Sequence, residues 1–214
     1  MFGLASAQGS LAIVADSATQ APEIYFLRTP DSAPQRLTDF NSSFASYAYP
    51  SSVEVQWHAH DGQPDDGILT YPIGYRPGKR YPLVVYSHGG PEAASTEDFD
   101  MGEIGPLRDL FAARGFLVFE PNYRGSDNLG NAHEHATYRH PGAGPDSDVN
   151  SGLKMLEARG IVDSSRIAAV GHSYGGYMTA WLISHQHFWR CAWWPTARWT
   201  GPRSMSFQAR CIMR

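Results

Sequence analysis

Cysteine is scarce in this 214-residue sequence, and long apolar runs are missing from it. Cys191 and Cys211 are the only cysteines, and they form neither a metal-ligand pattern nor a disulfide framework, which leaves the redox compartment undecided. No apolar run approaches the roughly 18–20 residues that span a bilayer. The N-terminal stretch MFGLASAQGSLAIVAD carries no basic residue ahead of its short apolar run, which argues against a signal peptide. We therefore expect a soluble, cytoplasmic protein.

An excess of positive charge is also missing. The formal net charge is −4, which argues against nucleic acid or an anionic membrane as a partner. Hydrophobic residues make up 42% of the chain and charged residues 18%, so the chain is able to bury a core. Its length suits one ordinary domain, or one domain plus a fragment.

The first part of the chain has the pattern of short β-strands. The runs SLAIVAD (residues 10–16) and APEIYFLR (21–28) are separated by the turn SATQ, which suits an antiparallel hairpin or one blade of a β-propeller. No second copy occurs at a period of about 40–50 residues, which excludes a whole propeller. Residues 41–52 have the composition of a linker, and residues 53–62 and 67–75 form a second predicted strand pair.

From Tyr81 onward, predicted strands alternate with predicted helices. The strands cover residues 81–87, 115–123 and 166–173, and the helices cover residues 104–115, 146–160 and 174–188. Near-continuous apolar strands between helices indicate a parallel sheet that is covered on both faces. The predicted fold class is α/β, with a doubly wound and mostly parallel sheet.

The stretch Gly171-His172-Ser173-Tyr174-Gly175 joins the last predicted strand to the last predicted helix. Two glycines flank the serine because the turn is too tight for a Cβ atom at either position. Ser173 is thereby placed at a helix N-terminus, where the helix dipole and free N–H groups favour a developing anion. We interpret Ser173 as a catalytic nucleophile. The alternative is a tight strand–helix turn with a passive serine.

A second glycine-rich loop, SHGGPE (residues 87–92), follows the first strand of the α/β part. A Gly-Gly pair after a strand can bring backbone N–H groups close to a substrate carbonyl. An oxyanion hole of this type combines the N–H group after the nucleophile, here that of Tyr174, with one from the loop, for which we choose Gly90. The alternative is an ordinary Gly-Gly-Pro turn.

Three ordered motifs carry a resemblance to a known family. They are YPLVVYSHGGP (81–91), PNYRGSDNLG (121–130) and the stretch from LEARG to GHSYGGYMTAWL (156–182). They resemble the catalytic domain of the prolyl oligopeptidase family, above all its acylaminoacyl-peptidase-like branch, and the likeness covers residues 53–192. The resemblance implies a serine peptidase that cleaves short peptides or acyl-peptides through an acyl-enzyme, without a metal or organic cofactor.

The resemblance also implies a domain organisation. In that family a β-propeller precedes an α/β-hydrolase domain and restricts access to short peptides. Residues 1–45 resemble the last blade of such a propeller, and residues 46–192 resemble the N-terminal part of the catalytic domain. Residues 193–214 form an atypical tail.

Acidic residues are absent after the proposed nucleophile. In α/β-hydrolases the catalytic triad runs Ser, then Asp or Glu, then His along the chain, yet the 41 residues after Ser173 hold no Asp and no Glu. Their only histidines, His185 and His187, lie on the predicted helix of residues 174–188. At about 1.5 Å per residue, they are roughly 18–21 Å from Ser173 along the helix axis. We expect these two histidines to be surface or packing residues.

Several polar residues before Ser173 are candidates to replace the missing base and acid of the triad. His88 and His172 match the family motif as structural residues, and either one acting as a non-standard base would make the chain a stand-alone carboxylesterase. The histidine-rich run 131–140 lacks the His-x-x-x-His spacing of a zinc hydrolase, and we interpret it as a polar loop. Asp146 and Asp148 open the next helix, where helix capping explains them.

The tail departs from everything before it. From residue 191 to the end there are four arginines and no acid, three of the six tryptophans lie within residues 193–199, and no periodicity of helix or strand is present. We hypothesise that the encoding reading frame shifts near residues 192–194, which produces an out-of-frame tail and an early stop. Reading the other two frames of the gene from that point tests this hypothesis. The alternative is a genuine lineage-specific tail.

A catalytic domain truncated in this way would end just beyond its nucleophile strand. Because further strands normally follow, we expect this strand to become an exposed edge through which the chain self-associates. Without a base and an acid, we expect a weak or inactive serine hydrolase, and a non-catalytic remnant is the other alternative. The expected partner is a short peptide or ester substrate.

Overall fold

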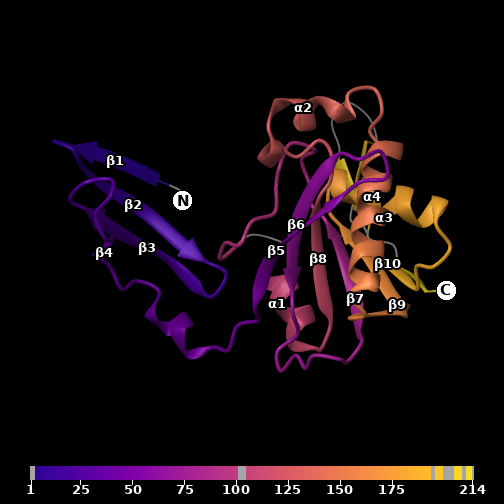
Figure 1. Cartoon of the computed structure of the whole chain (residues 1–214), viewed down its shortest axis with the longest axis horizontal. Helices are drawn as coiled ribbons and strands as arrows, with labels where there is room; N and C mark the ends of the chain where they lie inside the picture. Colours follow the sequence, from indigo (N-terminus) through magenta and orange to yellow (C-terminus); the bar gives the residue numbers. More distant parts are fainter. Residues whose placement is uncertain (1–2, 101–104, 194–195, 200–204, 209–210, 214) are drawn as a thin grey trace.

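The computed structural model describes residues 3–100, 105–193, 196–199, 205–208 and 211–213. It shows a four-stranded sheet near the N-terminus, a seven-stranded sheet with helices on its faces, and a two-stranded ribbon in the tail (Figure 1). Within these described residues, no helix is both long enough and apolar enough to span a membrane.

The N-terminal sheet is antiparallel throughout. Its strands, in spatial order, are β1 (Gly3–Ala7), β2 (Ser10–Ser17), β3 (Gln20–Leu27) and β4 (Gln35–Arg36). The predicted pair corresponds to β2 and β3. The other two strands were not predicted, because β1 consists of small residues apart from Leu4 and β4 has only two residues, so neither has a strand pattern. The interpretation of residues 1–45 as one propeller blade stays a prediction.

The linker between the two sheets packs on an aromatic residue of the larger unit. It contains a single short 3-10 helix, η1 (Ser42–Ser46). The rings of Phe44 and Tyr49 meet the ring of Phe99 edge to face, with centroids 5.7 and 5.2 Å apart. The Phe99 N–H group also donates to Asp16 Oδ2 at 3.2 Å, so the N-terminal sheet contacts the same residue.

The seven-stranded sheet carries the catalytic motifs. Its order is β13-β10-β9-β7-β8-β6-β5, with β5 (Ser52–His58), β6 (Pro64–Thr70), β7 (Tyr81–Ser87), β8 (Leu117–Asn122), β9 (Val162–Gly171), β10 (Cys191–Trp193) and β13 (Cys211–Met213). Strands β8, β7, β9 and β10 are parallel, and β5, β6 and β13 are antiparallel to their neighbours. This mixed, mostly parallel core confirms the α/β fold class.

Helices cover both faces of this sheet. The covering helices are α1 (Gly105–Ala113), α3 (Ala143–Ala158) and α4 (Tyr174–His185), whereas the short α2 (Asn131–Glu134) lies above the end of the sheet in Figure 1. Side chains of β7 alternate between the faces: Leu83 shares a core with Leu153 of α3 and Met178 of α4, whereas Val84 packs with Leu107 of α1. Both faces of the central strands are apolar because both are covered.

The predicted elements agree with the observed ones apart from their ends. Helix α3 starts at Ala143 rather than at residue 146, and β9 starts at Val162 rather than at residue 166. Val162 pairs with Tyr81 of β7, and the Tyr81 N–H group donates to Ile161 O at 2.8 Å. The longer strand therefore depends on a neighbour about 80 residues away in sequence, which local spacing does not reveal.

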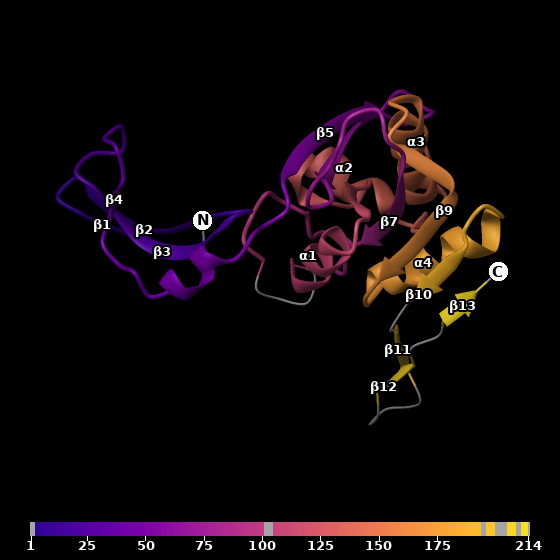
Figure 2. The same cartoon turned by 90° about the horizontal axis from the view of Figure 1, so that it is seen from below.

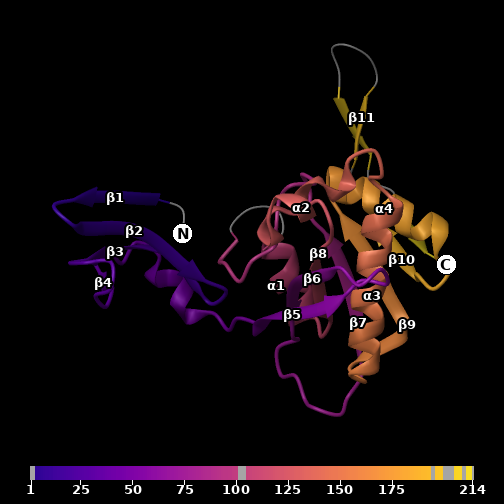
Figure 3. The same ribbon diagram turned by 45° about the horizontal axis from the view of Figure 1, so that its top comes forward.

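The expectation that the nucleophile strand forms an exposed edge is wrong for the described residues. Strand β10 pairs with β9, matching Cys191 to Ala168, and β13 pairs with β10 on its other side. The tail, which has no periodicity of helix or strand in its sequence, nevertheless contains β11 (Thr196–Trp199) and β12 (Met205–Gln208), which form the ribbon that projects from the main body (Figures 2 and 3). Residues 194–195, 200–204, 209–210 and 214 of the tail lie outside the described residues. The reading-frame hypothesis stays a prediction.

Candidate active site

Ser173 stands at a sharp turn between β9 and α4. Its backbone has φ 55° and ψ −119°, a conformation that L-residues other than glycine rarely adopt. The side chain is exposed, and it makes no capping hydrogen bond to the helix that it precedes. A strained, exposed serine between a strand and a helix is the geometry of a nucleophile elbow.

The two flanking glycines are needed for close backbone packing. A Cβ atom on Gly171 would lie 2.3 Å from Gly175 O, and one on Gly175 would lie 1.9 Å from Ser87 O. Neither distance leaves room for a methyl group. The predicted reason, a turn too tight for a Cβ atom, is confirmed for Gly171, whereas Gly175 has no room for a Cβ atom because the elbow packs against the end of β7.

The loop of residues 87–92 lies directly beside the elbow. A Cβ atom on Gly89 would lie 3.1 Å from His172 O and 3.3 Å from Ser173 Cβ. Gly90 has φ +59°, which favours glycine. Tyr174 is the first residue of α4, and the first N–H groups of a helix have no acceptor within it. The structure thus brings both loops together, while the oxyanion roles of Gly90 and Tyr174 stay predictions.

His88 is a buried residue with both ring nitrogens engaged. Its Nε2 atom lies 2.9 Å from Ser126 Oγ, and its Nδ1 atom lies 3.2 Å from Gly89 O. The ring stacks on Tyr123 with centroids 4.5 Å apart, and burial lowers the pKa of His88 to about 4. These contacts support the structural interpretation of His88. His172 is half-buried, and nothing in the structure tests it as a base.

The two histidines after Ser173 lie on or beyond the elbow helix, and both are exposed. His185 stacks on Trp181 with ring centroids 4.2 Å apart, and its Nδ1 atom lies 2.9 Å from Trp181 O. The structure therefore places His185 on the helix surface, as expected. His187 follows the end of α4.

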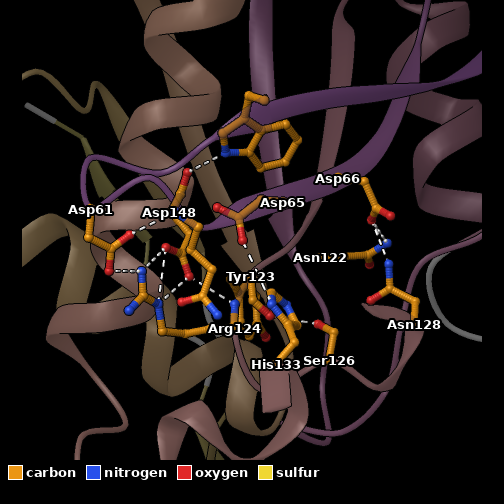
Figure 4. Close-up of polar contacts among 12 residues, drawn as sticks. Asp61, Asp65, Asp66, Asn122, Tyr123, Arg124, Ser126, Asn128, His133 and Asp148 are labelled. Atoms are coloured by element: carbon orange, nitrogen blue, oxygen red, sulfur yellow. Dashed lines mark hydrogen bonds and ion pairs between the residues drawn. The ribbon is translucent and has the colours of Figure 1, made fainter. Parts of the chain in front are cut away.

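Asp148 does not cap a helix, which corrects the expectation for this residue. It lies inside α3, is fully buried, and accepts hydrogen bonds from Arg124 Nε and Nη2 at 2.8 and 2.6 Å. These bonds raise the pKa of Arg124 (Figure 4). Asp146 lies in the first turn of α3, where Asn150 Nδ2 donates to its carboxylate at 3.0 Å.

Asp65 and His133 form a second buried polar pair that the sequence pattern did not reveal. His133 Nδ1 lies 3.9 Å from Asp65 Oδ1, and neither side chain has a hydrogen-bond partner among the described residues (Figure 4). Burial, together with the negative charge of Asp148, raises the pKa of Asp65 to about 8. The run 131–140, interpreted as a loop, instead contains α2 and the 3-10 helix η3 (His135–Thr137), which bury His133. Among the described residues, no group of three or more His, Cys, Asp or Glu could hold a metal ion.

Comparisons with known proteins find the same family that the motifs resemble. The sequence pattern of the prolyl oligopeptidase family matches residues 107–204. Dipeptidyl-peptidase 5 of Schizosaccharomyces pombe is 30% identical over 138 residues, which are 64% of this chain and 20% of that protein.

Two solved structures are similar in fold and in sequence. An acylaminoacyl peptidase in complex with Z-Gly-Gly-Phe-chloromethyl ketone is 25% identical, with a TM-score of 0.76 over 89% of this chain and 30% of that chain. A putative dipeptidyl aminopeptidase IV from Bacteroides ovatus is 29% identical, with a TM-score of 0.73 over 86% of this chain and 26% of that chain.

The sheet order, its covering helices and the elbow define an α/β-hydrolase fold. Residues 107–204 match the prolyl oligopeptidase family, in agreement with the resemblance that the motifs carry. It spans about a fifth of the length of the curated relative that it matches and less than a third of each solved structure.

Proposed function

We propose that this chain carries the nucleophile and the oxyanion hole of a serine peptidase that cleaves short peptides or acyl-peptides. The observation that carries the proposal is the conformation of Ser173, held beside a loop so close that a Cβ atom added to Gly89 would lie 3.3 Å from Ser173 Cβ. The names of the relatives, a dipeptidyl-peptidase and an acylaminoacyl peptidase, support peptides as the substrate class.

The proposed reaction proceeds through an acyl-enzyme. Ser173 Oγ gives its proton to a base and forms a bond to the substrate carbonyl carbon, and the N–H groups of Gly90 and Tyr174 stabilise the oxyanion. The carbon–nitrogen bond then breaks as the leaving amine takes up a proton. Water hydrolyses the resulting ester and regenerates the serine.

For the 214-residue polypeptide by itself we propose weak turnover or none. The sequence after Ser173 offers no Asp or Glu to orient a base, and both ring nitrogens of His88 are already engaged. An oxyanion hole and substrate binding without a triad accelerated the reaction roughly 10³–10⁴-fold over water in a model serine protease. Activity of the polypeptide is expected to lie within that residual range.

A fluorophosphonate probe tests the role of Ser173. Labelling joins Ser173 Oγ to phosphorus, releases fluoride and passes the hydroxyl proton to solvent. We expect slow labelling of the unmodified polypeptide and of Ser184→Ala, which removes an exposed hydroxyl from the same helix. Ser173→Ala is expected to remain unlabelled, as mass spectrometry of the intact protein will show.

The same samples distinguish the alternatives. Labelling that persists in Ser173→Ala, or no labelling of the unmodified polypeptide, would contradict a nucleophilic Ser173. Fast labelling with turnover of a p-nitrophenyl ester would instead indicate a carboxylesterase with a non-standard base.

A further inference from the structure

Residues 123–127, here called the support segment, contact both ends of the glycine-rich loop of residues 87–92. The Tyr123 hydroxyl donates to His88 O at 2.7 Å while its ring stacks on the imidazole. Ser126 Oγ lies 2.9 Å from His88 Nε2. His88 of this loop is therefore held through its backbone oxygen, its ring face and its ring nitrogen.

The support segment also contacts the far end of the same loop. The Asp127 N–H group donates to Glu92 O at 3.2 Å. A Cβ atom on Gly125 would lie 3.1 Å from Pro91 O, so the two backbones pass close to each other. The loop is thus held at both ends, with Gly89 and Gly90 between the two points.

Arg124, in the middle of the support segment, anchors it to the body of the domain. Its N–H group donates to Asp148 Oδ2 at 2.8 Å, and its side chain forms two further short bonds with the same carboxylate. Asp148 has no exposed surface, and Trp57 Nε1 donates to its carbonyl oxygen at 3.1 Å. Figure 4 shows the Asp148 carboxylate facing the Arg124 guanidinium. The ion pair is bidentate, and its carboxylate is fully buried.

We propose that Arg124 and Asp148 are positioning residues for the oxyanion hole, acting through Tyr123, Ser126 and His88. This inference rests on the proposed function of Ser173. Two adjacent glycines give their loop the largest backbone freedom available to a chain, so its geometry must come from outside contacts. The support segment supplies these contacts, and the ion pair fixes the support segment against α3. Catalytic donors need placement within about 0.5 Å, which makes such support necessary.

The test compares Asp148→Asn with a matched control, Asp163→Asn. The control also removes a carboxylate that accepts a bond from an arginine, because Arg166 Nε donates to Asp163 at 2.7 Å, but it does so at an exposed site in β9. Hydrogen exchange of the peptide covering residues 86–94 is measured on the full chain at a temperature well below melting. The bimolecular rate of fluorophosphonate labelling is measured on the same samples.

Asp148→Asn is expected to raise exchange of residues 86–94 at least about ten-fold, because hydrogen bonds to charged groups are strong. Labelling is expected to slow about 10- to 100-fold, since a displacement of about 1 Å has that effect. The control is expected to leave both quantities unchanged. If Asp148→Asn does not fold, then Tyr123→Phe and Ser126→Ala, which each remove one hydroxyl, take its place with the same expected direction.

Unchanged exchange of residues 86–94 in a folded variant would overturn the positioning role. So would equal slowing of labelling in the control, because that would reflect a general loss of stability. If the variant exchanges faster while even the unmodified chain is never labelled, the support of the loop stands and the proposed nucleophile fails.

Discussion

The two glycines of the elbow have steric reasons for their identity. Ser173 between them has positive φ, and Gly175 is glycine because a Cβ atom there would lie 1.9 Å from Ser87 O. A non-glycine residue at positive φ costs free energy, which surrounding contacts must offset. The backbone around Ser173 is thus specified by packing against β7 rather than by the helix alone.

Gly175→Ala is expected to lower the free energy of unfolding by about 3 kcal/mol, because the added methyl group overlaps backbone that cannot move aside. Urea denaturation followed by tryptophan fluorescence measures this loss. Gly62→Ala is the control: it has φ +85° but open space around its Cβ position, so it should lose only the backbone term of about 1 kcal/mol. Equal losses at both positions would show that the contact with Ser87 is not the cause.

At the scale of elements, the N-terminal sheet is held to its linker by one buried carboxylate. Glu23 of β3 accepts the N–H groups of Asn41 and Phe40 at 2.8 and 3.2 Å, and it pairs with Arg36 of β4 at 3.0 Å. Burial alone would raise the pKa of Glu23, but these bonds and one from the Thr38 hydroxyl outweigh burial and lower it to about 2.

This lowered pKa makes the N-terminal sheet sensitive to acid. Because the pKa of Glu23 is about 2 in the folded chain against 4.5 for a free side chain, its stabilisation is present above pH 4.5 and is lost as the pH falls toward 2. We expect hydrogen exchange of residues 20–41 to accelerate relative to the main sheet between pH 5 and about 2.5.

Glu23→Gln is expected to show the faster exchange already at neutral pH and to lose the acid dependence in this segment. Glu54→Gln, at an exposed position of β5, is the control and should retain it. If the acid dependence survives in Glu23→Gln, carboxylates other than Glu23 cause it.

At the same scale, the structure shows which elements could be predicted from local pattern. Strand β7 is a near-continuous apolar run and helix α4 is rich in apolar residues, and both appear almost where predicted. Helix α2 is short and polar, so its pattern is that of a loop. Asp148 was misinterpreted because its partner, Arg124, belongs to the preceding strand–helix connection, and no local pattern relates the two residues.

At the scale of the whole molecule, the two sheets differ in how well they are covered. Every residue of β8 is buried, whereas every residue of β2 keeps part of its surface exposed. The outer strands of the seven-stranded sheet are β5 and β13, and the edge at β5 is partly blocked because Glu97 Oε1 accepts the Glu54 N–H group at 2.7 Å. Exposed apolar sheet surface and open edges favour association.

We propose that the 214-residue polypeptide self-associates in solution through these sheets. Sedimentation velocity at about micromolar to millimolar concentration should show species larger than a monomer. Val14→Lys, which places a charge on β2, is expected to reduce association more than His58→Lys at the exposed end of β5. A single monomeric species at all concentrations would contradict the proposal.

The sequence by itself determined the strand–helix alternation, the elbow and its glycines, and the resemblance to the prolyl oligopeptidase family, because these features depend on residues that are close together in the chain. The tertiary structure decided which strand lies beside β9, and it brought Arg124 to Asp148 and Asp65 to His133. Those pairs join different elements, so they depend on the order of strands in the sheet. Spacing along the chain does not encode that order, which follows from how the elements bury their apolar faces together.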